Sequence, residues 1–182
     1  MSIGHVDRDF SADFVRKRYT AQHVLKYDVC VVFRPIECSD QAAFKEFFKS
    51  LSPASVHFRF LAIIKELPNE TIERSCNLDY SREVAIVAED EACGEIVGVV
   101  RLVVNRNLGQ GEFALVVADA WQGMGLGWQL TTYIIKIAKD YDLKEIRCII
   151  SSDNRKMIKL AEKAGMTTKS ADTETTVMTL ML

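Results

Sequence analysis

The sequence predicts a mixed α/β domain in which helices flank a mostly antiparallel sheet with one parallel pair of strands. Short turns at 90–94 and 105–111 separate apolar runs and predict antiparallel hairpins. An apolar strand at 112–118 leads through a glycine-rich turn into a long amphipathic helix, and another strand follows at 145–151. A strand–helix–strand connection of this kind is a right-handed crossover between parallel strands. With 182 residues and 48% hydrophobic content, the chain suits one domain with a sizeable core.

Residues 1–28 are charged and lack a sustained apolar run, so we interpret them as an N-terminal extension before a single domain at 29–182. The first strand is expected at 29–34, because Pro35 ends the apolar run. Asp40 then fits the N-cap of a helix with its apolar residues on one side. The elements expected next are helices at 53–60 and 69–78 and strands at 83–89, 95–105 and 112–118.

The helix after the glycine turn is expected to bury one stripe against the sheet, because its apolar residues repeat at helical spacing. Asn154 or Asp153 fits the N-cap of the next helix, and Gly165 fits its C′ position. The last strand is expected at 175–182, within a terminal hairpin. The apolar stripe consists of Leu126, Leu130, Ile134, Ile137 and Tyr141.

Glycines at 123, 125 and 127 predict an anion site at the start of the long helix. Glycine tolerates positive φ, so the turn can bring bare N–H groups against a phosphate. The first N–H groups of a helix lack intrahelical partners, and the helix dipole adds partial positive charge. A dinucleotide fingerprint would need glycine where Trp128 stands, and the Gly-Lys-Ser/Thr of a P-loop is absent. The turn therefore predicts a pyrophosphate site of another class, with a tight connection that binds nothing as the alternative.

The run from Gln122 to Gly127 resembles the Q/R-x-x-G-x-G/A signature of the Gcn5-related N-acetyltransferases, the GNAT family. The segments 95–102 and 112–118 are similar to its third and fourth strands, and 154–165 is similar to its closing helix. The resemblance covers roughly residues 30–182 and implies that acetyl-CoA binds between two splayed parallel strands. It implies an N-acetyltransferase with no metal cofactor.

Three further segments, 47–60, 79–88 and 111–117, resemble the acetyltransferase domain of bacterial protein-lysine acetyltransferases that modify acyl-CoA synthetases. This narrower resemblance implies a protein lysine as the acceptor amine, such as one on an acyl-CoA synthetase. A polyamine, an aminoglycoside and a protein N-terminus remain open. Two other classes of function also remain open, a non-catalytic CoA sensor and an interaction module that binds no CoA.

The resemblance assigns acetyl-CoA to backbone and side-chain groups around the glycine turn. The strand backbone is implied to pair with the pantetheine amides, and the turn N–H groups are implied to hold the pyrophosphate. Asn154 is implied to contact CoA, although a helix N-cap explains that residue equally well. The implied cofactor-binding residues are Leu115, Val116, Val117, Gln122, Gly123, Met124, Gly125, Leu126, Gly127, Trp128 and Asn154.

Glu112 is the candidate catalytic residue. A lysine ammonium has a pKa of about 10.4 and must lose a proton before it attacks a thioester, so a nearby base is needed. Glu112 begins the strand that should carry the thioester, and the matching glutamate of the lysine acetyltransferases has that role. Many relatives place a general-acid tyrosine where this chain has Ala161. Asp79 and Tyr80 resemble an acceptor-loop motif but also suit an ordinary turn.

Composition excludes several classes of partner. With a net charge of −2, the chain lacks the excess of basic residues that is typical of nucleic-acid-binding proteins. Its charges are scattered and form no polybasic membrane anchor. No apolar run approaches the roughly 20 residues that span a bilayer. Five cysteines without a CxxC pair favour the reducing cytoplasm. His5, His23 and His57 lack ligand spacing, so no metal site is expected.

Overall fold

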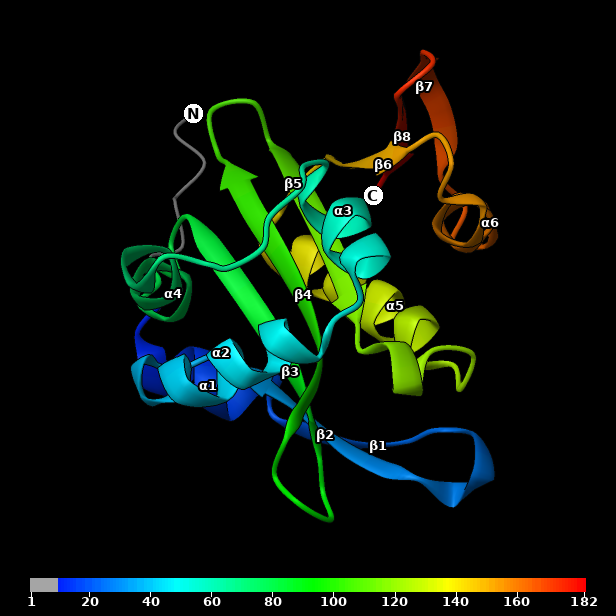
Figure 1. Cartoon of the computed structure of the whole chain (residues 1–182). Coiled ribbons are helices and arrows are strands. Elements are labelled where there is room, and N and C mark those ends of the chain that lie inside the picture. Colours follow the sequence, from blue (N-terminus) through cyan, green and yellow to red (C-terminus); the bar gives the residue numbers. More distant parts are fainter. Residues whose placement is uncertain (1–9) are drawn as a thin grey trace, which may run out of the picture.

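The computed structural model describes residues 10–182, which form one eight-stranded sheet in the order β1-β2-β3-β4-β5-β6-β8-β7 (Figure 1). Neighbouring strands are antiparallel except for the parallel pair β5 and β6. This arrangement confirms the predicted fold class. The strands are β1 Ala21–Val24, β2 Cys30–Pro35, β3 Glu83–Asp90, β4 Ile96–Asn105, β5 Gln110–Val117, β6 Glu145–Ser151, β7 Thr167–Ala171 and β8 Thr175–Met181.

Helices cover both faces of the sheet (Figure 1). Side chains alternate along β3, so that Val84 and Ile86 pack with α1 and α5 while Ala85 and Val87 pack with α2, α3 and α4. We call the first side the α5 face and the second side the α3 face. The helices are α1 Ala12–Tyr19, α2 Gln41–Ser50, α3 Pro53–Phe60, α4 Asn69–Cys76, α5 Leu126–Asp140 and α6 Arg155–Lys163.

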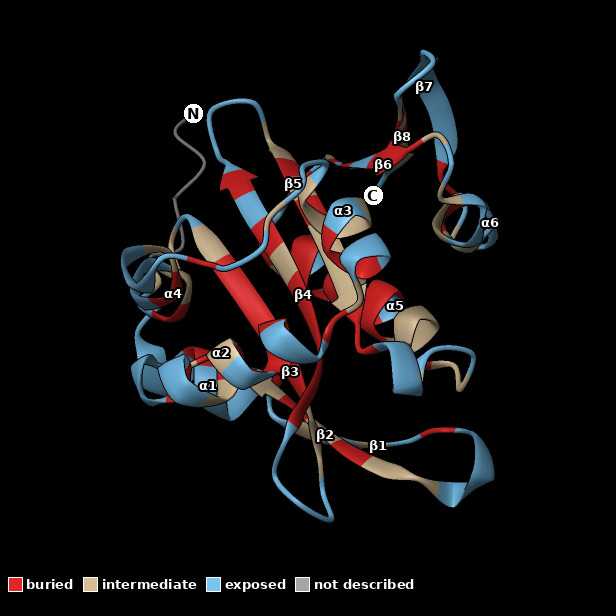
Figure 2. Ribbon diagram, in the orientation of Figure 1, coloured by how far each residue is buried: buried red, intermediate tan, exposed pale blue. Residues whose placement is uncertain are grey.

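The crossover through α5 confirms the predicted parallel connection. Its predicted apolar stripe is buried, with Leu126, Leu130, Ile134 and Ile137 all at 0% exposure. Buried residues are dense in β3, β4 and α5, whereas β7 and the outer side of α6 are exposed (Figure 2). The core therefore holds the start of α5, and with it the glycine turn, in a fixed position against β4 and β5.

The strand expected at 29–34 is present as β2, but it is not the first strand, because β1 precedes it and pairs with it. The helix α1 also packs on the sheet, with Val15 and Tyr19 only 1% and 3% exposed. Each element is too short for its pattern to stand out alone, and tertiary packing stabilises both. Residues 12–24 thus contribute to the fold, while residues 1–9, including His5, lie outside the described part of the chain.

Asp40 precedes α2 as expected, but its side chain does not cap the helix. Its carboxylate instead accepts hydrogen bonds from Arg34 Nη1 at 2.7 Å and Nη2 at 2.9 Å, and from the Glu37 N–H at 2.7 Å. A bidentate arginine is a stronger partner than a helix N–H. The sequence also did not locate β7, whose five residues are all exposed and carry no apolar alternation. Within residues 10–182, no helix is long and apolar enough to cross a membrane.

Candidate active site

The parallel strands β5 and β6 separate after three residue pairs. Gln110, Gly111 and Glu112 align with Glu145, Ile146 and Arg147, whereas β5 stays paired with β4 as far as Val117. Figure 1 shows β6 and β8 turning away from the lower part of β5. The backbone of β5 beyond Glu112 is therefore an open strand edge, a structure that binds peptide-like chains by hydrogen bonding.

The apolar run at 115–117 is typical of a buried strand, but two of its three side chains are only partly buried. Leu115 and Val116 are half-buried, and Val117 is buried. The physical reason is the separation of β6, because an interior parallel strand is covered only where neighbours lie on both sides. The same separation leaves the β5 backbone accessible.

The turn after β5 has the geometry that the glycine pattern predicts. Gly123 and Gly125 adopt φ of +82° and +95°, which L side chains rarely adopt, and a Cβ built on either would meet nothing within 4 Å. The space beside these glycines is thus open. Gly125 is the N-cap of the 15-residue helix α5, so the free N–H groups of its first turn lie beside that space. The turn can accept an anion of the size of a phosphate.

Gln122 ties the turn to the opposite layer. Its Nε2 donates to the Val117 carbonyl and to Ser55 Oγ, both at 3.2 Å. Ser52 N–H, Ser52 Oγ and Ser55 Oγ donate to the Asp119 carboxylate at 2.7 to 2.9 Å. Desolvation opposes ionisation, but these hydrogen bonds hold the pKa of Asp119 below its usual value. The start of α3 is therefore fastened to the segment that carries the glycine turn.

Glu112 lies where β5 and β6 begin to separate. Its Oε2 accepts a hydrogen bond from Arg147 Nε at 2.9 Å and forms an ion pair with Arg147 Nη2 at 2.9 Å, and its side chain is 42% exposed. Phe113 faces α5 and Val116 faces α3, so alternation places Glu112 on the α3 face. Directly across on β4 stands Val103, which is 49% exposed. Glu112 thus presents a carboxylate to an accessible part of the sheet.

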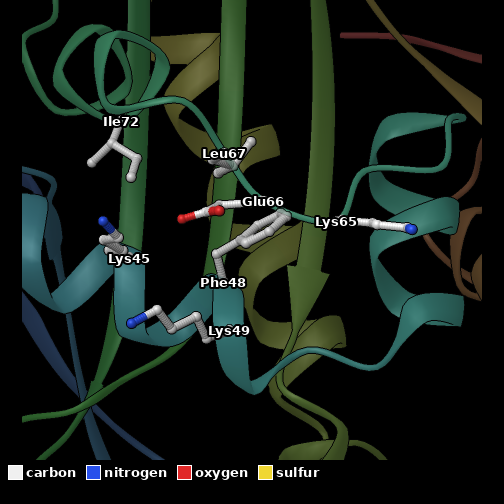
Figure 3. Close-up of a pocket in the computed structure, with 7 residues that line it drawn as sticks. All are labelled: Lys45, Phe48, Lys49, Lys65, Glu66, Leu67 and Ile72. Atoms are coloured by element: carbon white, nitrogen blue, oxygen red, sulfur yellow. The ribbon is translucent and has the colours of Figure 1, made fainter.

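Two cavities open on the α3 face. One of about 40 Å³ is lined by Arg59, Phe60, Val99, Arg101 and Val116 together with residues of α2 and α4. The other, of about 280 Å³, lies between α2, α4 and the preceding loop and contains none of the predicted site residues (Figure 3). There the Glu66 carboxylate points toward the cavity while the Lys65 amine points away (Figure 3). The smaller cavity is the one that reaches β5.

The comparisons with known proteins agree with this geometry. Residues 47–166 match the profile of the Acetyltransferase (GNAT) family. The chain belongs to this family. It is 34% identical over 129 residues to the acetyltransferase PA5475 of Pseudomonas aeruginosa, which covers 70% of this chain and 69% of that protein. It is an N-acetyltransferase, an acyltransferase that uses acetyl-CoA.

Solved structures of the family share the fold. The GNAT domain of S. lividans PAT superposes with a TM-score of 0.85 at 25% identity, covering 91% of this chain and 98% of that domain. Spermidine N-acetyltransferase from Vibrio cholerae, in complex with CoA and spermine, gives a TM-score of 0.69 at 18% identity, covering 83% and 95%. The second likeness concerns the fold alone.

Of the remaining predicted CoA contacts, Met124, Leu126 and Trp128 belong to the turn and the start of α5, and Asn154 lies at the start of α6. Asn154 caps α6, because its Oδ1 accepts the Met157 N–H at 3.1 Å. Trp128 projects toward α6, where Lys163 Nζ lies 4.2 Å from its ring centroid. Leu126 is buried at 0% exposure, so only its backbone faces the turn. The side chain of Met124 is half-buried.

Three other residues have structural roles. Ala161 is fully buried, so the position of the missing tyrosine lies inside the core. Tyr80 donates its hydroxyl proton to the Ile36 carbonyl at 2.8 Å, and burial raises its pKa. Asp79 accepts hydrogen bonds from Ser81 N–H and Oγ, which lower its pKa. The Asp79-Tyr80 motif thus makes a turn, as its ordinary interpretation predicts.

Sequence reasoning missed a contact between the β1–β2 turn and the glycine turn. The Lys26 N–H donates to the Met124 carbonyl at 3.2 Å, and Lys26 Nζ donates to the Gly123 carbonyl at 3.4 Å. Gln129 Nε2 donates to the Val24 carbonyl at 2.8 Å. No local pattern could have revealed this contact, because about 100 residues separate the partners.

Proposed function

We propose that this acetyltransferase transfers an acetyl group from acetyl-CoA to the ε-amine of a protein lysine, with Glu112 as the general base. The observation that carries the proposal is the position of the Glu112 carboxylate, at the point where β5 leaves β6 and its backbone becomes accessible. The resemblance of 47–60, 79–88 and 111–117 to protein-lysine acetyltransferases supports the acceptor class. Similarity to the GNAT domain of S. lividans PAT supports it as well.

Acetyl-CoA fits the structure in two places. The open edge at 115–117 offers N–H and C=O groups that suit the amides of pantetheine. The N–H groups from Gly123 to Trp128 suit the pyrophosphate, because positive φ at Gly123 and Gly125 keeps side chains out of the space beside them. The thioester supplies an activated acetyl carbon with a good leaving group. Gln122 acts through its bonds to Val117 and Ser55, which hold the turn in place.

Glu112 then accepts the proton that the acceptor ammonium must lose before attack. Arg147 Nε donates a hydrogen bond to Oε2 and Nη2 forms an ion pair with the same oxygen, which holds the carboxylate and leaves Oε1 to accept the proton directly or through water. The leaving CoA thiolate corresponds to a thiol of pKa about 8.5, so it departs without a strong general acid. The buried Ala161 is consistent with that chemistry.

The acetyl group passes directly to the amine in this proposal. A cysteine nucleophile would have to be an accessible thiolate. Cys148 lies on β6 near Glu112, but burial raises its pKa to about 12. Burial likewise raises the pKa of Cys76 to about 11. All five cysteines are free thiols, which also supports the cytoplasm as the compartment of the reaction.

The test is to incubate the protein with labelled acetyl-CoA in a native extract and to map the modified residues by mass spectrometry. Label on lysine side chains, with one free CoA released per acetyl group transferred, is the expected result. Label confined to small amines or to protein N-termini would overturn the proposed acceptor. Calorimetry with CoA separates the remaining alternatives: a sensor binds CoA without thiol release, and an interaction module does not bind it.

A further inference from the structure

The α3 face of the sheet places a second charged group near Glu112. Val103 stands opposite Glu112, and the next residue of β4 on the same face, Arg101, stands opposite Ala114. Residues two apart along a strand lie about 7 Å from each other and share a face. The Arg101 side chain therefore belongs to the same surface as the proposed base.

Arg59 reaches this surface from α3. It lines the cavity of about 40 Å³ together with Arg101 and Val116, and its guanidinium lies 5.0 Å from the centroid of the Phe60 ring. Two cations thus approach the floor formed by β4 and β5. A lysine acceptor that approaches Glu112 across the α3 face of the sheet would come close to both arginines.

The two arginines differ in their partners. Arg101 donates to Glu83 Oε1 at 2.6 Å and to the Ser75 carbonyl at 2.6 Å, so its charge is compensated. Arg59 makes no ion pair with any described residue. Burial and the neighbouring Arg101 charge lower the pKa of Arg59 to about 10, only partly offset by Glu83. A half-buried guanidinium without an ion-pair partner among the described residues is stabilised by a carboxylate that arrives with a ligand.

We propose that the acceptor carries a carboxylate close to its reactive amine and that Arg59, supported by Arg101, binds this carboxylate. The inference rests on the proposed function and specifies its acceptor: a lysine with an aspartate or glutamate within a few residues. A small amino acid offers the same pair of groups and is distinguished by experiment. A polyamine offers only further positive charge, which two arginines in one cavity repel.

The experiment compares three blocked peptides that are identical except for the residue beside a central lysine: glutamate, glutamine or lysine. A hydrogen bond between charged groups corresponds to a preference of roughly tenfold to a hundredfold. We expect kcat/KM to fall by that factor from glutamate to glutamine, mainly through KM, and further for lysine. Arg59→Gln should bring the glutamate and glutamine peptides within about threefold of each other, and Arg59→Lys should restore part of the preference.

Arg74→Gln is the matched control, because Arg74 is an exposed arginine on α4 and should keep the full preference. Thermal unfolding and CoA calorimetry establish that each variant is folded. Equal rates for the three wild-type peptides, or an unchanged preference in Arg59→Gln, would overturn this inference while leaving lysine acetylation intact. If no lysine peptide reacts but free glutamate does, the carboxylate inference stands and the protein acceptor is wrong. Reaction of spermidine alone would overturn both.

Discussion

The proposed CoA side of the site is built from backbone, whereas the acceptor side is built from side chains. The open edge of β5 and the turn at Gly123 and Gly125 offer N–H and C=O groups. The proposed acceptor side combines Glu112 on β5 with Arg101 on β4 and Arg59 on α3, and the two arginines line one cavity. A backbone site depends on a short local sequence, while a side-chain site depends on how distant segments pack. The two sides should therefore respond differently to substitution.

The largest effect on CoA binding is expected from Gly125→Glu. Gly125 has a φ of +95°, and a glutamate there would both strain the turn and bring negative charge into the space proposed for the pyrophosphate. We expect CoA affinity to fall more than a hundredfold, measured by calorimetry, equivalent to about 3 kcal/mol. Gly94→Glu is the control, because Gly94 has a φ of +76° with open space beside it, in the β3–β4 turn. Wild-type affinity in a folded Gly125→Glu protein would contradict the proposed pyrophosphate site.

A smaller effect, on both sides at once, is expected from Asp119→Asn. The Asp119 carboxylate accepts three hydrogen bonds from Ser52 and Ser55 and so links α3 to the segment before the glycine turn. Partial loss of these bonds should lower the melting temperature by about 2–4 °C. The rate on a lysine peptide should fall several-fold, because α3 also carries Arg59.

The difference in stability between wild type and Asp119→Asn should depend on pH, with a definite sign. Hydrogen bonds lower the pKa of Asp119 in the folded protein despite its desolvation. The ionised Asp119 therefore contributes to the free energy of unfolding above the unfolded pKa of about 3.9. This contribution is lost as the pH falls through the lower pKa of the folded protein. Melting curves of wild type and Asp119→Asn should differ by a constant amount from pH 6 to 8 and converge below about pH 4. A difference that grows in acid would contradict the role of the ionised carboxylate.

The smallest effect is expected from Lys26→Ala, which tests whether the β1–β2 turn supports the CoA side. The Lys26 backbone N–H still bonds the Met124 carbonyl after this change, and only the 3.4 Å side-chain bond to Gly123 is lost. We expect about a twofold to threefold rise in KM for acetyl-CoA with kcat unchanged. Lys139→Ala, at an exposed position near the end of α5, serves as the control. An equal change in KM for acetyl-CoA in both variants would show that the Lys26 side chain does not contribute to acetyl-CoA binding.

The contrast between a site built from backbone and one built from side chains explains which features the sequence could predict. The glycine turn, α5 and β6 follow from local pattern, and β6 was predicted at its observed limits of 145–151. The parallel pairing followed from the connection between the strands. These elements carry the CoA side, which is why its geometry could be expected.

The missed features depend on packing between segments far apart in the chain. Val15 and Tyr19 are buried only because α1 docks on the sheet, and Leu115 is half-exposed only because β6 separates from β5. Arg59 and Arg101 lie in separate segments, 47–60 and 95–102, and their spacing does not show that they line one cavity, which depends on how α3 packs over β5. An acceptor site assembled in this way cannot be recognised from spacing along one segment.

The most direct test of Glu112 as the general base is the rate of Glu112→Gln on a lysine peptide as a function of pH, with acetyl-CoA affinity measured alongside. Glutamine keeps the size of the side chain, and the freed Arg147 is 51% exposed and remains hydrated. CoA affinity should stay within about twofold, while kcat falls roughly a hundredfold to ten-thousandfold at neutral pH. The defect should shrink as the pH rises, because more of the acceptor amine is then already neutral. Glu95→Gln, at an exposed position beside the β3–β4 turn, should behave as wild type. A Glu112→Gln rate within a few-fold of wild type at neutral pH, with the chemical step limiting turnover, would contradict the proposed base.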